Sequence, residues 1–166
     1  PIQPETQTII DLFNQYDFVL SADFHTGFES VVYPWLTTAN SHPKESLYQT
    51  ISSDYAQLAQ QYSPSEPDYF KTFNNSGYVQ GSDVYLAHNT LSDYVNYYHD
   101  CFNLTIEISE DKMLPENKLD DIWNYNYRAI LNYMEEATFM HGLKAPTNLY
   151  ATPVSNTKIH LDWKDH

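Results

Sequence analysis

The sequence predicts an α/β sandwich, in which helices pack on a mixed or parallel β-sheet. Two apolar runs, 18–24 and 103–109, are typical of strands, and segments with apolar residues every three or four positions lie between and around them. The chain of 166 residues, 42% of them hydrophobic, is long enough to bury one hydrophobic core. It has no run of some 18 apolar residues, so no membrane span is predicted.

The first elements are a helix and a buried strand. Pro4 and Glu5 open the helix, because proline suits a first helical turn, and its apolar face carries Ile9, Ile10 and Phe13. The strand over 18–24 ends at His25, just before Gly27.

A second helix is predicted to begin at Pro43, with an apolar stripe formed by Leu47, Ile51, Tyr55, Leu58 and Tyr62. Residues 63–83 contain two prolines and two glycines and predict a long loop. A short helix is expected after Ser92 and Asp93, and the second strand follows over 103–109. Pro115 opens a long helix that runs to about residue 137, and its expected stripe is Trp123, Tyr127, Ile130 and Met134.

The composition changes after Gly142. Residues 157–163 alternate between apolar and polar side chains, which places Ile159, Leu161 and Trp163 on one face of a strand. Together with the residues from Ala145 onward, this segment resembles the first two strands of a fibronectin type III domain. The resemblance implies two units, 1–143 and a truncated β-sandwich start over 144–166. Because two strands cannot bury a core, we expect the sequence to be a piece of a longer protein.

The charge of the chain argues against nucleic acids as partners. The formal net charge is −14, with only 8 Lys and Arg residues, whereas binding of nucleic-acid phosphates needs clustered cations. Such an acidic field either attracts basic substrates weakly or is simply a solvated surface. The single cysteine, Cys101, excludes an internal disulfide.

Two polar side chains share one face at the end of the first predicted strand. Alternation places Asp23 and His25 opposite Phe24, where open α/β sheets bind their ligands. Asp23 is placed to orient the imidazole of His25 if that ring binds a metal. A partly buried histidine with satisfied hydrogen bonds would fit the same pattern.

The second strand carries a carboxylate in an apolar run. Glu107 lies in the sequence Leu-Thr-Ile-Glu-Ile and shares a face with Thr105. Burial of a carboxylate is costly unless it is paired or functional, and it raises the pKa toward the range of a general base. A salt-bridged glutamate on an edge strand is the alternative.

These segments resemble those of the zinc metallocarboxypeptidases, most closely the carboxypeptidase N/E/D subgroup and its bacterial relatives. The run FVLSADFH at 18–25, followed by VVYPW at 31–35, is similar to that subgroup's FVLSANLHGG and VNYP. The run DCFNLTIEIS at 100–109 is similar to NCFE(V/L)TLELS, and GSDVY at 81–85 matches nGxxWY. Pro4-Glu5-Thr6 matches the family's PET. The resemblance covers about residues 1–142 in the family's order.

The resemblance implies both a fold and a reaction. The fold is a three-layer α/β sandwich around a mixed sheet, and this chain would hold an incomplete version of it. In that reaction Zn²⁺ activates water to remove C-terminal amino acids from peptides or proteins. His25 would be one zinc ligand, and Glu107 the general base. Tyr85 would hydrogen-bond the substrate near its terminal carboxylate, although a surface tyrosine in a loop is the alternative. Ser92 stands at the family position, fifteen residues before the catalytic glutamate, that helps to set side-chain preference.

Several family residues have no counterpart here. The H-x-x-E motif that supplies the other two zinc ligands precedes the third ligand in the family, as do the arginines that bind the terminal carboxylate. His42-Pro43-Lys44-Glu45 has the motif's letters but follows His25. We therefore expect these 166 residues alone to be inactive.

For the parent protein, the resemblance implies a secreted, periplasmic or cell-surface location. The fibronectin type III part would allow contact with a cell surface or matrix. Two alternatives remain. One is a related zinc deacylase, amidase or esterase, and the other is a non-catalytic peptide-binding or adhesion module with a degenerate peptidase fold.

Overall fold

The computed structural model of the chain describes residues 2–71, 73–141, 147–155 and 158–164. The helices are α1 (Pro4–Gln15), α2 (Glu45–Gln61), α3 (Gly81–Val84), α4 (Leu91–His99) and α5 (Leu119–His141), with a 3-10 turn over Glu116–Lys118. The strands are β1 (Leu20–His25), β2 (Phe28–Tyr33), β3 (Tyr78–Gln80), β4 (Phe102–Ser109), β5 (Thr147–Ser155) and β6 (Lys158–Lys164).

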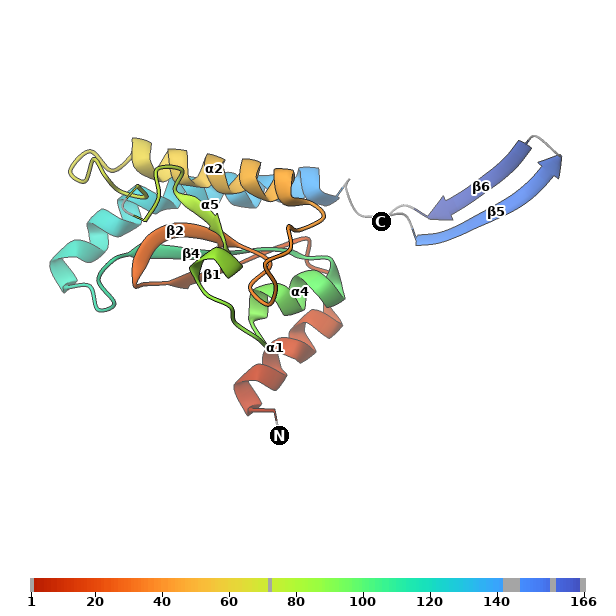
Figure 1. Ribbon diagram of the computed structural model, residues 1–166, viewed down its shortest axis with the longest axis horizontal. Coiled ribbons are helices and arrows are strands. Elements are labelled where there is room, and N and C mark those ends of the chain that lie inside the picture. The colour runs from red at the N-terminus through yellow and green to blue at the C-terminus, as the bar shows by residue number, and fades with distance from the viewer. Residues whose placement is uncertain (1, 72, 142–146, 156–157, 165–166) are drawn as a thin grey trace.

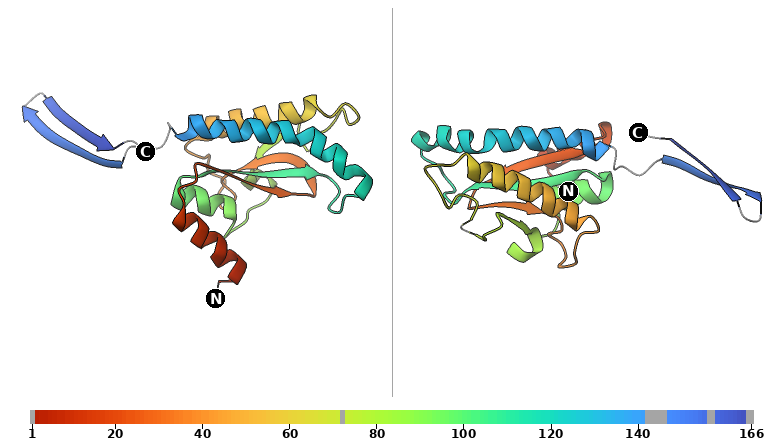
Figure 2. Two further views of the ribbon diagram at one scale, coloured as in Figure 1. Left: turned by 180° about the vertical axis from the view of Figure 1, so that it is seen from behind. Right: turned by 90° about the horizontal axis from the view of Figure 1, so that it is seen from above.

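The main sheet has four strands in the order β1-β4-β2-β3. β4 runs parallel to β1 and antiparallel to β2, and β2 runs parallel to β3, so the sheet is mixed. Helices α2 and α5 lie together on one face, and α4 lies with α1 on the other (Figures 1 and 2). The predicted α/β sandwich around a mixed sheet is therefore confirmed.

The main core lies between the sheet and the helices α2 and α5, and several of its members are tyrosines. The Tyr55 hydroxyl donates to Oδ1 of Asn126 at 3.1 Å, and the Asn126 amide donates to the Tyr69 hydroxyl at 2.7 Å. The Tyr133 hydroxyl lies 3.0 Å from the carbonyl oxygens of Ser21 and Phe102, which joins α5 to β1 and β4. Tyrosine thus fills this core with apolar rings whose polar tips are satisfied.

The stripe expected on the long helix is wrong at Trp123 and Met134, whereas Ile130 does pack against the core. Trp123 and Met134 are 62% and 63% exposed. The buried face lies one position earlier in the chain and includes Ile122, Tyr125, Asn126, Ala129 and Tyr133. The spacing of large apolar residues did not predict this face, because the face includes a hydrogen-bonded Asn and a small Ala.

Other expectations need correction at the strands. Residues 63–83 are not all loop, since they contain β3 and the start of α3. β2 was not predicted, because its first half, Phe28-Glu29-Ser30, shows no continuous apolar run. β1 was expected to be buried but is half-exposed. Within the described residues β4 is its only strand neighbour, so its other edge is unpaired.

Helix α1 begins at Pro4 as predicted, but two other helices begin at other residues than expected. α2 begins at Glu45 rather than Pro43. Helix α4 begins at Leu91, because the side chain of Thr90 caps it by accepting a hydrogen bond from the backbone N–H of Asp93. Ser92 and Asp93 therefore lie in its first turn and not before it.

β5 and β6 form a separate two-stranded antiparallel sheet. β6 corresponds to the strand predicted at 157–163, and β5 is the other of the two strands expected in this part of the chain. The predicted boundary between 143 and 144 lies outside the described residues, as do the side chains of Ile159, Leu161 and Trp163. None of the described helices has the length and apolar content that a membrane crossing requires.

Candidate active site

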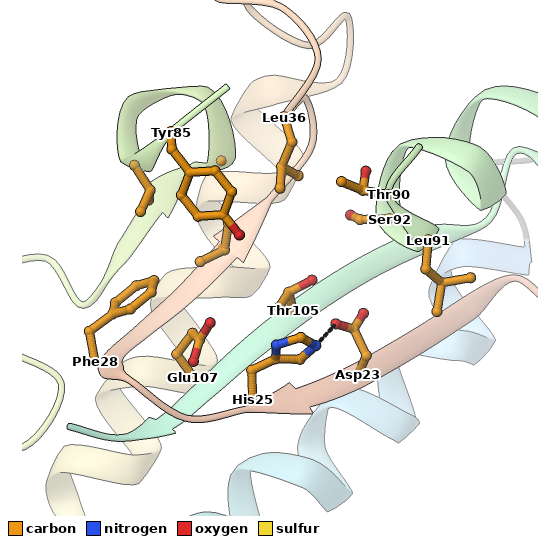
Figure 3. Close-up of a pocket in the computed structure, with 13 residues that line it drawn as sticks. Asp23, His25, Phe28, Leu36, Tyr85, Thr90, Leu91, Ser92, Thr105 and Glu107 are labelled. Carbon is orange, nitrogen blue, oxygen red and sulfur yellow. Dashed lines mark ion pairs between the residues drawn. The ribbon is translucent and has the colours of Figure 1, made fainter. Parts of the chain in front are cut away.

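The fold places the predicted metal ligand and the predicted base side by side. His25 on β1 pairs with Glu107 on β4, and Asp23 pairs with Thr105, in a parallel register. Because paired residues of parallel neighbours project to the same face, all four side chains line one cavity of about 250 Å³. Figure 3 shows them along its floor, on the sheet face that is turned away from α2 and α5.

His25 is accessible in this cavity. Its side chain is 59% exposed, and its Nε2 lies 3.4 Å from Oδ2 of Asp23. Burial raises the pKa of Asp23, and its other oxygen, Oδ1, is buried and has no hydrogen-bond partner among the described residues. His25 is thus no buried core histidine, and a carboxylate lies beside it in the position expected from the sequence.

Glu107 is the second carboxylate on the cavity floor. Its Oε2 is buried, and no residue in the described part of the chain hydrogen-bonds it. Burial raises the pKa of Glu107, and the nearby His25 opposes that rise. No ion pair of the described residues includes Glu107, so the salt-bridge alternative is not observed.

A raised pKa alone does not distinguish Glu107 from other carboxylates. Burial also raises the pKa of Glu29 to about 7. Glu29 lies on the opposite side of β2, however, in a different hollow. The distinguishing feature is the cavity, since it gathers three of the six buried polar side-chain atoms that lack a partner in the described residues: those of Asp23, Ser92 and Glu107.

The other two predicted site residues line the same cavity. Tyr85 directly follows α3 and is 61% exposed, and Ser92 projects from the first turn of α4. Sequence reasoning missed most of the apolar lining, which consists of Phe28, Val32, Leu36, Val84 and Leu91. The sequence did contain a signal for part of this lining, because the VVYPW motif at 31–35 includes Val32 and ends next to Leu36.

Asp93 holds the chain segment that follows β2 by hydrogen bonds. Its carboxylate accepts hydrogen bonds from the backbone N–H of Leu36 at 3.0 and 3.1 Å. It also accepts from the backbone N–H and the hydroxyl of Thr37, at 2.9 and 2.7 Å. Asp93 thereby fixes the segment after β2 against α4 and holds Leu36 at the cavity.

His42 lies outside this cavity. It is buried, and its Nε2 lies 2.7 Å from Oδ1 of Asn96, while its ring packs on Trp35. The H-x-x-E letters at 42–45 are therefore part of a packed helix start, in agreement with the sequence-based expectation.

A family model described as zinc carboxypeptidase matches residues 2–129, which is more than half of the chain. The chain belongs to the zinc carboxypeptidase family. Its sequence is 31% identical to carboxypeptidase Z of Mus musculus over 95% of the chain and 26% of that protein. It is 29% identical to the carboxypeptidase N catalytic chain of Homo sapiens, over 81% of the chain and 32% of that protein.

Solved carboxypeptidase structures share the fold. Thrombin activatable fibrinolysis inhibitor superposes with a TM-score of 0.69 at 15% identity, over 82% of this chain and 34% of that one. Carboxypeptidase A from Helicoverpa armigera superposes with a TM-score of 0.61 at 17% identity, also over 82% and 34%. This zinc carboxypeptidase chain thus spans about a quarter to a third of the length of these relatives.

The described residues fit part of a zinc site. His25 offers an accessible imidazole beside a buried carboxylate, which is how a zinc-bound histidine is commonly oriented. Nowhere in the described residues, this cavity included, do three His, Cys, Asp or Glu side chains come together in a way that could hold a metal ion. This zinc carboxypeptidase chain therefore presents one candidate ligand, whereas a catalytic zinc site uses three protein ligands and a water.

Proposed function

We propose that the protein containing this chain is a zinc-dependent carboxypeptidase that removes C-terminal amino acids from peptides or proteins. The observation that carries the proposal is the pairing of His25 with Glu107 on the floor of one cavity. His25 supplies one zinc ligand, and the remaining ligands come from residues outside this chain. Zinc in such a site polarises the scissile carbonyl and lowers the pKa of water.

Glu107 acts as the general base. Its carboxylate takes a proton from the water whose oxygen attacks the carbonyl carbon, and it passes that proton to the amine nitrogen as the C–N bond breaks. The raised pKa suits this role, because a base must hold the proton long enough to return it. Tyr85 contacts the substrate near its C-terminal carboxylate, and its exposed side chain lets it approach a bound peptide.

Two further parts of the proposal concern the whole protein. Residues 144–166, which include the hairpin of β5 and β6, begin a fibronectin type III domain that contacts a cell surface or matrix. The protein acts outside the cytoplasm, in the periplasm, at the cell surface or in the medium.

The activity is tested with matched peptide pools that have free or amidated C-termini. The whole protein is expected to release single amino acids from the free C-termini, and at least about 100-fold more slowly from the amidated ones, because a buried polar site rejects a substrate that lacks its partner group. Mass spectrometry of the shortened peptides measures both rates. Cleavage within the peptides, hydrolysis of acyl or ester groups alone, or no hydrolysis would contradict the proposal. The last result would favour a non-catalytic binding module.

A further inference from the structure

A second hollow, which we call the aromatic hollow, lies beside helix α4 and has a volume of about 490 Å³. Among the described residues only Thr90 lines both this hollow and the catalytic cavity. The aromatic rings that line it are Trp35, from the segment after β2, and Tyr94, Tyr97 and Tyr98 on α4. The three tyrosines share one face of the helix, because they are three and four positions apart.

These rings pack on their neighbours and yet remain accessible. The centroid of the Trp35 ring lies 4.6 Å from that of the buried His42 ring. The Tyr98 centroid lies 5.0 Å from that of Tyr97 and 5.3 Å from that of Tyr94. Even so, Tyr97 and Tyr98 are 73% and 70% exposed. Because rings that are already held in place lose little conformational entropy when a ligand binds, and because tyrosine and tryptophan are enriched at interfaces, the hollow has the composition of a binding surface.

The charge of the aromatic hollow favours a neutral ligand. No Lys, Arg or Glu side chain is among the described residues that line it. The one carboxylate, that of Asp93, is buried and already accepts four hydrogen bonds from Leu36 and Thr37. A charged ligand would therefore lose its water without gaining a partner of opposite charge.

The hydrogen-bonding groups that are left free in the hollow are mostly donors. The Trp35 N–H and the hydroxyls of Tyr97 and Tyr98 have no hydrogen-bond partner within the described residues. The amide of Asn89 adds two donors and one carbonyl acceptor. A sugar, whose hydroxyls also donate, would find no free carboxylate to accept from them. A run of prolines, in contrast, offers carbonyl acceptors and has no N–H groups.

We infer that the aromatic hollow binds a proline-rich segment of a partner protein, in the extended polyproline II conformation. Segments of this kind dock in grooves lined by aromatic rings, and their stiffness keeps the entropy cost of binding low. The proline rings lie against Tyr97 and Tyr98, and the Trp35 N–H donates to a carbonyl oxygen of the segment. This inference does not depend on the proposed carboxypeptidase activity, because the hollow is separate from the catalytic cavity.

The test measures binding to the whole protein by fluorescence anisotropy. The probe is a labelled peptide of ten prolines with an amidated C-terminus, and a Gly-Ser peptide of the same length is compared with it. The proline peptide is expected to bind at least about 10-fold more tightly, because the flexible peptide loses more conformational entropy and has no rings to stack. Tyr97→Ala should weaken proline binding by about 10–30-fold, as for an aromatic anchor, and Tyr97→Phe by about 3–10-fold, the contribution of one hydrogen bond. Both changes affect an exposed side chain, so the variants should fold.

Tyr150→Ala is the matched control, since Tyr150 is also an exposed tyrosine but lies on β5 and does not line the hollow. It should leave the affinity unchanged. Equal binding of the two peptides, proline binding that survives Tyr97→Ala, or tighter binding of cellohexaose or choline than of the proline peptide would overturn the inference. A dimer in sedimentation that Tyr97→Ala dissociates would also overturn it, because a second copy would then cover the hollow.

Discussion

Replacement of Glu107 by Gln is expected to lower kcat for peptide hydrolysis by about 10²–10⁴-fold, the usual contribution of a general base. The amide keeps the size of the side chain but cannot accept a proton from water. The change should not disturb folding, because it removes a partly buried charge that has no ion pair in the described residues. The measurement is the rate of C-terminal amino-acid release by the whole protein, with zinc content and thermal unfolding as accompanying readouts.

Glu110→Gln is the matched control for this variant. Glu110 lies three residues further along, is exposed, and lines a different hollow. Its replacement should leave kcat within about twofold of the wild type. Comparable activity in Glu107→Gln and the wild type, with equal zinc content, would show that the reaction does not pass a proton through Glu107.

Asp93→Ala is expected to lower the free energy of unfolding by about 2–5 kcal/mol. The substitution removes the carboxylate that accepts four hydrogen bonds. The backbone N–H groups of Leu36 and Thr37 then lose their acceptor. Urea denaturation of the whole protein measures the loss as a lower midpoint.

Asp83→Ala serves as its control, because Asp83 is exposed on α3 and is expected to change stability by no more than about 0.5 kcal/mol. An Asp93→Ala variant as stable as this control would mean that the hydrogen bonds of Asp93 do not hold the segment after β2 in place.

The sequence predicted the floor of the site well, because strand alternation is a local rule. Once 18–24 and 103–109 are taken as strands, period two places Asp23 with His25 and Thr105 with Glu107. The alternation did not predict that these two strands pair with each other. They are neighbours in the sheet although they lie about 80 positions apart in the chain. Only the family resemblance indicated that His25 and Glu107 meet.

The apolar lining of the cavity and the core face of α5 could not be predicted from such local rules. Leu36 lines the cavity because Asp93, which is 57 positions away, holds its backbone, and no periodicity reports a contact of that range. On α5 the core accepts Asn126 because Tyr55 and Tyr69 satisfy its amide. A polar residue with satisfied hydrogen bonds looks like a surface residue in sequence, and the helix was therefore assigned the wrong face.

The central claim is that His25 is a zinc ligand in a working carboxypeptidase, and zinc content tests it most directly. The measurement is the molar ratio of zinc to whole protein after dialysis, by elemental analysis, for the wild type, His25→Ala and His88→Ala. His88 is an exposed histidine that does not line the cavity. We expect about one zinc per molecule in the wild type and in His88→Ala, and a clear loss in His25→Ala, because removing one protein ligand weakens a three-ligand site. Equal zinc in all three proteins, or a wild type that binds none, would contradict the account.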